Sequence, residues 1–237
     1  MQSKFKTLAI IICRTGSKRL KNKIFLKINK KTILELIYEK LSICKNIDKI
    51  IIATSSKKND DIVATFAKNK DIDCIRGSEK NVLSRISKAQ KYYKEYNIIV
   101  RANADCPLFI PKILDFDINR LAKSKFDLLS PFYKNDIPFG FSFVVFKSKT
   151  IIKISKLARK KVHKEHVENY CFDNKKKFKI HPCKYDKKLH APNINLTLDT
   201  KKDYLKIKKI FKVLKLTYKE TKPTQIIKFH KKEFNEK

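Results

Sequence analysis

The 237-residue sequence has few glycines and few acidic side chains. It has only three glycines (Gly16, Gly77 and Gly140) and no tryptophan, whereas glycine makes up about 7% of an average protein. In so glycine-poor a chain, a remaining glycine more often marks a backbone geometry that other residues adopt only with strain. Asp and Glu number 23 against 57 Lys and Arg, which gives a formal net charge of +34.

Long apolar runs are also absent. No stretch approaches the roughly 18–20 apolar residues of a membrane-spanning helix, so we expect no membrane partner. Residues 1–12 are basic and then apolar, as in a secretory signal, but they run directly into Arg14 without a small-residue cleavage site. The six cysteines form no C-x-x-C pair, which argues against a zinc cluster or a disulfide framework and favours reduced thiols in the cytoplasm.

The excess of lysine has two interpretations. A nucleic-acid-binding protein would concentrate its cations on one stretch or stripe, whereas here lysine occurs in every segment. We therefore interpret the charge as a general composition and do not expect nucleic acid as a partner. A basic protein still attracts polyanionic substrates such as nucleotides.

Short apolar runs alternate with helical patterns through the first half of the chain. Runs at 8–12, 49–53, 73–75 and 98–102 are typical of buried strands, and Thr32 with Glu35 predicts a capped helix start. This alternation predicts an α/β fold with a mainly parallel central sheet flanked by helices. Runs at 141–146, 178–180 and 194–198 predict a small antiparallel extension. We expect one domain over 1–237, with a core at about 7–214 and a solvated basic C-terminal tail.

The segment 13–20 follows the first predicted strand and contains one glycine, two hydroxyls and three cations. Backbone N–H groups and cations that converge on one turn form an anion site, here expected to bind a polyphosphate. The order of residues fits neither a Walker A loop nor a dinucleotide fingerprint. Arg14, Lys18 and Arg19 are placed to neutralise phosphates, and Lys23 to reach back over them, where cations stabilise developing negative charge.

Polar clusters follow all four predicted strands, at 14–19, 54–56, 76–78 and 103–105. The carboxyl ends of parallel strands meet at one edge of a sheet, where ligands bind in open α/β folds. We therefore expect one shared ligand pocket at this edge. The alternative is that these are the ordinary polar loops of such a fold.

Asp105 and Asp199 each follow a predicted strand, so both are expected at this edge. Two carboxylates can hold a hard divalent cation, with water and phosphates as further ligands. Alternatively, Asp199 caps the helix that begins after Thr200, with Asp203 in a capping box. His163 and His166 share a helix face, but no third ligand accompanies them, so contacts with a second substrate or a partner subunit are favoured over a metal.

Six motifs occur in the order found in a known family. They are IICRTGSKRL (11–20), IIATS (51–55), RGSEKNVLSR (76–85), VRANADCPL (100–108), KEHVENY (164–170) and LTLDT (196–200). Together they make the chain resemble the cytidylyltransferase-like proteins of the spore coat polysaccharide biosynthesis protein F type, over about residues 7–210. More distantly, the chain is similar to the CMP-sialic acid and CMP-Kdo synthetases.

The resemblance implies a nucleotide-diphosphosugar-transferase-like (GT-A-like) fold and a Mg²⁺-dependent transfer of CMP from CTP to a sugar, expected to be acidic, for surface polysaccharide synthesis. It implies that pyrophosphate is released, and a homodimer is a family expectation. The implied catalytic residues are Arg14, Lys18, Lys23 and Asp105. The implied nucleotide contacts are Arg14, Gly16, Ser17, Lys18, Arg19, Lys23, Thr54, Arg76, Gly77, Ser78 and Asn103, and the implied metal ligands are Asp105 and Asp199.

Two departures from the family pattern stand out. Residues 141–144 read FSFV, where family members often carry an acidic residue, and this loss affects the expected sugar contacts. The segment 29–31 reads NKK where a glycine is usual. The alternatives to a cytidylyltransferase are a relative that uses another nucleoside triphosphate or an alcohol-phosphate acceptor and, least favoured, a charge-driven nucleic-acid binder.

Overall fold

The computed structural model describes residues 5–133 and 136–234. A seven-stranded sheet lies at its centre, with the order β5-β4-β1-β6-β8-β7-β9. Its strands are β1 (Thr7–Ile12), β4 (Lys49–Ser55), β5 (Cys74–Gly77), β6 (Ile98–Asn103), β7 (Leu128–Leu129), β8 (Val144–Lys147) and β9 (Ile180–His181). The neighbours β5, β4, β1 and β6 are parallel, whereas β8 is antiparallel to β6 and β7. The predicted mainly parallel sheet with a small antiparallel extension is confirmed.

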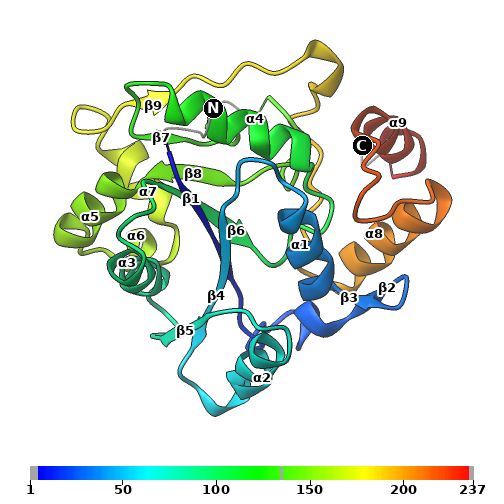
Figure 1. Cartoon of the computed structure of the whole chain (residues 1–237). Coiled ribbons are helices and arrows are strands. Elements are labelled where there is room, and N and C mark those ends of the chain that lie inside the picture. The colour runs from blue at the N-terminus through cyan, green and yellow to red at the C-terminus, as the bar shows by residue number, and fades with distance from the viewer. Residues whose placement is uncertain (1–4, 134–135, 235–237) are drawn as a thin grey trace.

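Helices cover both faces of this sheet (Figure 1). On one face, α3 (Val82–Tyr92), α5 (Ser148–Leu157) and α7 (Val167–Asp173) share a core with the sheet, and the short α6 (Lys161–Glu165) lies beside them. The other face carries α1 (Ile33–Ser42), α2 (Asp61–Asn69), α4 (Pro111–Ala122), α8 (Lys201–Val213) and α9 (Pro223–Glu233). Two apolar cores therefore form, one on each side of the sheet.

The apolar run of β1 explains why this strand lies in the interior of the sheet. Leu8 and Ile10 pack into the core on the side of α3, while Ala9 and Ile11 pack into the core on the side of α1. Because alternate side chains of a strand point to opposite faces, a run that is apolar throughout fits a strand covered on both faces.

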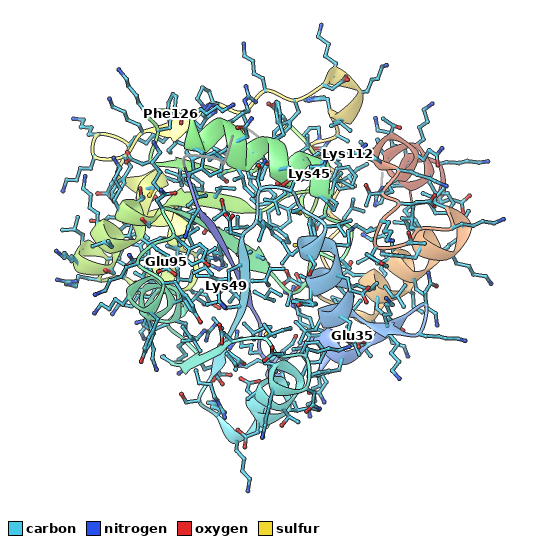
Figure 2. The ribbon with its side chains drawn as sticks, viewed as in Figure 1. Glu35, Lys45, Lys49, Glu95, Lys112 and Phe126 are labelled. Carbon is cyan, nitrogen blue, oxygen red and sulfur yellow. The ribbon has the colours of Figure 1, made fainter. Side chains whose placement is uncertain are left out.

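Two helix starts follow the capping pattern in the sequence. At α1, the Thr32 hydroxyl accepts from the Glu35 N–H and the Glu35 carboxylate accepts from the Thr32 N–H; Figure 2 labels Glu35. At α8, Thr200 and Asp203 make the same reciprocal pair. Thr200 is therefore the cap of α8, so the alternative role of Asp199 as the helix cap is wrong and its side chain is left for another role.

The second half of the chain departs from the predicted pattern in four places. Strand β9 begins at Ile180, two residues later than the start of the predicted run, and it pairs parallel, not antiparallel, with β7. Strand β8 begins at Val144, three residues later than the predicted run. Residues 194–198 make one isolated bridge in place of a strand, because the Asn195 side chain accepts from the Thr197 N–H and hydroxyl and turns the backbone locally. The C-terminal region also differs from a solvated tail, since Ile226 and Ile227 of α9 are buried in the core.

The structure also contains a short hairpin and three 3₁₀ turns among its described residues. They are the hairpin β2 (Lys27–Ile28) and β3 (Lys31–Thr32), and the 3₁₀ turns η1 (Lys23–Phe25), η2 (Lys58–Asp60) and η3 (Lys187–Leu189). Asn29 and Lys30 form the two-residue turn of the hairpin with φ of 48° and 69°, which is the type of turn where glycine is usual. Gly140 has φ of 101°, and an added Cβ would lie 3.2 Å from the Leu196 carbonyl carbon.

Among the residues that the structure describes, the lysine side chains do not gather on one edge. In Figure 2, nitrogen-tipped side chains project around the whole outline, and the labelled Lys45, Lys49 and Lys112 lie in the turn after α1, on β4 and on α4. No described helix combines the length and apolar character needed to cross a membrane. All six cysteines are unpaired, and burial raises the pKa of each thiol.

Candidate active site

Two aspartates distant in sequence meet at the carboxyl end of the parallel strands. The Lys23 Nζ atom lies 3.0 Å from Asp105 Oδ2 and 2.9 Å from Asp199 Oδ1. Asp105 follows β6, Asp199 precedes α8, and Lys23 begins η1 after the first loop. One ammonium group therefore joins three segments of the chain at one point.

Arg19 adds a second cation to this point, because its Nη2 lies 3.1 Å from Asp199 Oδ2. The Lys23 side chain is 13% exposed, and those of Asp105 and Asp199 are 29% and 30% exposed. Burial lowers the pKa of Lys23, but Asp105 and Asp199 outweigh it and raise that pKa above its ordinary value. Lys23 is therefore a charged, partly shielded counter-ion of both carboxylates.

The two carboxylates also fit the divalent cation that the family implies. Mg²⁺ is usually held by one or two carboxylates together with water and substrate phosphates, rather than by a complete protein cage. Within residues 5–133 and 136–234, no group of three or more His, Cys, Asp or Glu residues could hold a metal alone. A pair of oxygen donors at an open edge is thus a site that a phosphate ligand would complete.

Asp60 organises the first loop, a role that the sequence did not reveal. Its buried carboxylate accepts from the Thr15 N–H and the Thr15 hydroxyl, both at 2.7 Å, and from the Ser55 hydroxyl. Burial raises the pKa of Asp60, but these hydrogen bonds outweigh it and hold the pKa below its usual value. By its position Asp60 is the N-cap of α2, yet its side chain makes no cap hydrogen bond.

Gly16 follows Thr15 at a close approach to Glu79. A Cβ on Gly16 would lie 2.9 Å from Glu79 Oε1. The same oxygen lies 3.3 Å from Arg14 Nη1, and Arg14 Nη2 lies 3.7 Å from Glu165 Oε1. The absence of a side chain at Gly16 therefore leaves room for Glu79 to pair with Arg14, and Arg14 faces carboxylates rather than solvent alone.

The rest of the predicted phosphate loop is open to solvent. The Ser17 N–H donates to the Thr15 carbonyl at 2.8 Å, which closes a tight turn, and the Ser17 hydroxyl accepts from the Leu20 N–H at 3.4 Å. Lys18 is exposed on this turn. A contact of Ser17 or Lys18 with phosphate stays a prediction.

Two predicted nucleotide contacts do not fit their positions. Thr54 is fully buried in β4, where a bound nucleotide cannot reach it. Arg76 donates to the Ser55 and Lys57 carbonyls and pairs with Asp61 at 2.7 Å, so it supports the loop after β4. Neither side chain contributes to the cluster around Lys23, because β4 and β5 direct them elsewhere.

Residues around the end of β5 are fixed by a buried arginine. Arg85 of α3 donates to the carbonyls of Ser78 and Glu79, at 2.7 and 3.2 Å, and its Cγ lies 3.1 Å from the position of a Cβ on Gly77. These contacts shape the loop 77–80. Asn103 ends β6 at the same edge and is partly exposed, so nucleoside contacts of Ser78 and Asn103 stay predictions.

The two histidines of the motif at 164–170 and its flank take different positions. His163 is buried, and its Nε2 lies 2.7 Å from Asp173 Oδ2, which ties α6 to α7. A substrate contact is therefore wrong for His163, whereas His166 is exposed at the α6–α7 junction. Arg101 Nη1 lies 3.1 Å from Glu168 Oε1 and so fixes the same junction against β6.

Comparisons with known proteins identify the family of the chain. The sequence profile of the cytidylyltransferase family matches residues 8–229. The chain is 37% identical over 218 residues to an uncharacterized protein of Methanocaldococcus jannaschii, across 91% of this chain and 88% of the relative. It is 30% identical over 210 residues to the spore coat polysaccharide biosynthesis protein SpsF of Bacillus subtilis, across 86% and 85%.

Solved structures share the fold. A cytidylyltransferase from Leptospira borgpetersenii superimposes with a TM-score of 0.84 at 28% identity, over 96% of this chain and 94% of that one. A CMP:2-keto-3-deoxy-manno-octonic acid synthetase complexed with CTP shares the fold with a TM-score of 0.65 at 14% identity, over 89% and 100%. The resemblance read from the motifs is confirmed: the chain belongs to the cytidylyltransferase family.

Proposed function

We propose that this protein activates a sugar, expected to be acidic, by transferring CMP from CTP with release of pyrophosphate, in the cytoplasm and for surface polysaccharide synthesis. The observation that carries the proposal is the meeting of Asp105, Asp199, Lys23 and Arg19 at one edge of the sheet. Carboxylates for a divalent cation and cations for phosphates are the two requirements of nucleotidyl transfer.

In the proposed reaction, a hydroxyl oxygen of the sugar attacks the α-phosphorus of CTP. The bond from that phosphorus to the bridging oxygen breaks, pyrophosphate leaves with the bonding electrons, and the hydroxyl proton passes to solvent. Lys23, Arg19, Lys18 and Arg14 neutralise the charge that grows on the leaving group. At the Gly16–Ser17 turn, the phosphates can lie close to the main chain.

Asp105 and Asp199 would hold Mg²⁺, which when bound neutralises phosphate oxygens and polarises the attacked phosphorus. Ser78 and Asn103 are proposed to line the nucleoside pocket, at the carboxyl ends of β5 and β6. His166 and Glu165, at the α6–α7 junction, are proposed to face the sugar; Glu165 already lies 3.7 Å from Arg14. An acidic sugar agrees with the net charge of +34.

The test measures pyrophosphate release with Mg²⁺, each of the four nucleoside triphosphates in turn, and a panel of acidic and neutral sugars. We expect turnover with CTP and an acidic sugar, and a loss of about 100-fold or more in Asp105→Asn. Asp71→Asn is the matched control, because Asp71 lies in an exposed turn at φ 53°, which asparagine also adopts.

Turnover with another triphosphate but not with CTP would identify that triphosphate as the donor. Full activity of Asp105→Asn would refute the metal assignment. Tight, steeply salt-dependent DNA or RNA binding without turnover would favour the nucleic-acid alternative.

A further inference from the structure

The ammonium group of Lys23 lies where a divalent cation shared by Asp105 and Asp199 would lie. Nζ is 3.0 Å from Asp105 Oδ2 and 2.9 Å from Asp199 Oδ1. A Mg²⁺ ion binds carboxylate oxygens at about 2.0–2.1 Å, so an ion bound by these same two oxygens would be forced close to the lysine nitrogen. Two cations at that separation repel each other strongly.

We propose that Lys23 is an internal placeholder for the metal: it neutralises Asp105 and Asp199 in the free protein, and the divalent cation enters together with nucleotide phosphates that take over the ammonium group. This inference rests on the proposed function, because it assigns a metal–triphosphate as the substrate form that the site accepts.

The charges of the site support the joint binding of the cation and the nucleotide. Two carboxylates face two cations, since Arg19 pairs with Asp199 at 3.1 Å while Lys23 pairs with both aspartates. The cluster is therefore neutral as it stands and offers a free divalent cation little attraction. A triphosphate carries several negative charges that Lys23 and Arg19 can pair with, which would return both carboxylates to the metal.

The local backbone lets Lys23 change partners without unfolding the loop. Lys23 opens η1, and the next residue, Ile24, is buried and anchors the turn in the core. Asn22 before it takes a left-handed conformation with φ 54°. The ammonium group sits on a flexible four-carbon stem, so it can move from the carboxylates to a phosphate while Ile24 stays in place.

A placeholder lysine couples the affinity for the metal to the affinity for the nucleotide. If a triphosphate frees the two carboxylates, then each ligand raises the affinity of the other by the same factor. Removing the Lys23 charge removes this part of the coupling, because the aspartates are then free for the cation at all times. The metal affinity of the nucleotide-free protein is thus the quantity that reports on the placeholder.

The experiment titrates Mn²⁺ into nucleotide-free protein and follows the signal of free Mn²⁺ by electron paramagnetic resonance. We expect weak binding by the wild type and binding at least tenfold tighter by Lys23→Met. Lys21→Met is the matched control: it removes the same charge two residues before Lys23, and among the described contacts the exposed Lys21 pairs with neither aspartate. The control should bind Mn²⁺ as the wild type does.

Adding Asp105→Asn to Lys23→Met should abolish the gained binding, which places the ion between the two carboxylates. Lys23→Gln is a second variant in case the methionine side chain disturbs folding, and circular dichroism checks both. Equal Mn²⁺ affinity of wild type and both Lys23 variants would overturn the placeholder, as would tight binding by the nucleotide-free wild type.

The result is separable from the proposed function. Tighter Mn²⁺ binding by Lys23→Met in a protein that turns over no triphosphate would uphold the placeholder and refute the reaction. Turnover of CTP with unchanged Mn²⁺ affinity in the Lys23 variants would uphold the reaction and refute the placeholder.

Discussion

The buried carboxylate of Asp60 connects the first loop to the end of β4, and its removal is a direct test of how that loop is held. Asp60 is 2% exposed and accepts hydrogen bonds from the N–H and hydroxyl of Thr15 and from the hydroxyl of Ser55. Asp60→Ala leaves these three donors in a buried space without their acceptor. The loop 13–20 should then lose its fixed position beside the candidate active site.

The magnitude follows from the number of bonds. A hydrogen bond to a charged group contributes about 1.5 kcal/mol or more, so three of them correspond to about 4.5 kcal/mol or more for Asp60→Ala. For a domain of this size, a loss of about 4.5 kcal/mol lowers Tm by roughly 9–18 °C. Asp60→Asn keeps one carbonyl oxygen for Thr15 and lets Ser55 accept from the new amide, so it should lose roughly half as much.

Urea unfolding followed by circular dichroism measures these losses, with Asp61→Ala as the neighbouring control. Asp61 is largely exposed and pairs only at the surface with Arg76, so its loss should stay below about 1 kcal/mol. A loss below about 1 kcal/mol in Asp60→Ala would refute the assigned role, because three buried donors cannot lose a charged acceptor at so small a cost.

The pH dependence of the same variants provides an independent check. The pKa of Asp60 in the folded protein lies below that of the unfolded chain. The stability that it contributes is therefore present above about pH 4 and is lost as pH falls through the folded pKa. The difference between wild type and Asp60→Asn should shrink in that acid range, and a constant difference would contradict the ionised form of Asp60.

Three further predictions concern single buried or strained groups, each measured by urea unfolding. Burial lowers the pKa of Lys40 to about 7, so the free energy of unfolding of the wild type rises between about pH 7 and about pH 10. Relative to the wild type, Lys40→Met should become more stable by about 1.4 kcal/mol for each pH unit as pH falls through that range. A difference in stability that does not change with pH would contradict a neutral Lys40 amine. Burial raises the pKa of Asp117 to about 7, so the free energy of unfolding of the wild type falls between about pH 4 and about pH 7. Relative to the wild type, Asp117→Asn should therefore become more stable as pH rises through that range, whereas Lys40→Met becomes more stable as pH falls. Lys30→Gly should stabilise the hairpin turn by about 1 kcal/mol, because Lys30 has φ 69°; destabilisation would show that the lysine side chain contributes contacts of its own.

Apolar periodicity predicted the first half of the fold because its strands are buried on both faces. Runs such as 8–12 and 98–102 have few competing conformations once helices flank them, and both appear as strands. The short strands β7 and β9 have two residues each, too few for a period. The sequence predicts a tail in place of helix α9 because lysines surround its two buried isoleucines, Ile226 and Ile227.

The candidate site was predictable where charge and strand ends coincide. The positions of Asp105, Asp199 and Lys23 after predicted strands or in the first loop predict a shared site, and the structure brings Lys23 within hydrogen-bond distance of both aspartates. Sequence alone did not show that the lysine pairs with both aspartates, since that depends on distances between segments 82 and 176 residues apart. The sequence does not reveal the role of Asp60, because an aspartate before a helix normally indicates a cap.

The state of the thiols bears on how this molecule can be studied. Five of the six cysteines are buried, the sixth, Cys74, is half-buried, and burial holds the pKa of each above its ordinary value. Because the thiolate is the form that attacks electrophiles, maleimide and methanethiosulfonate reagents meet little competition from the native side chains. A cysteine introduced beside the first loop could therefore be labelled selectively with a spin label or fluorophore, without first replacing the native cysteines.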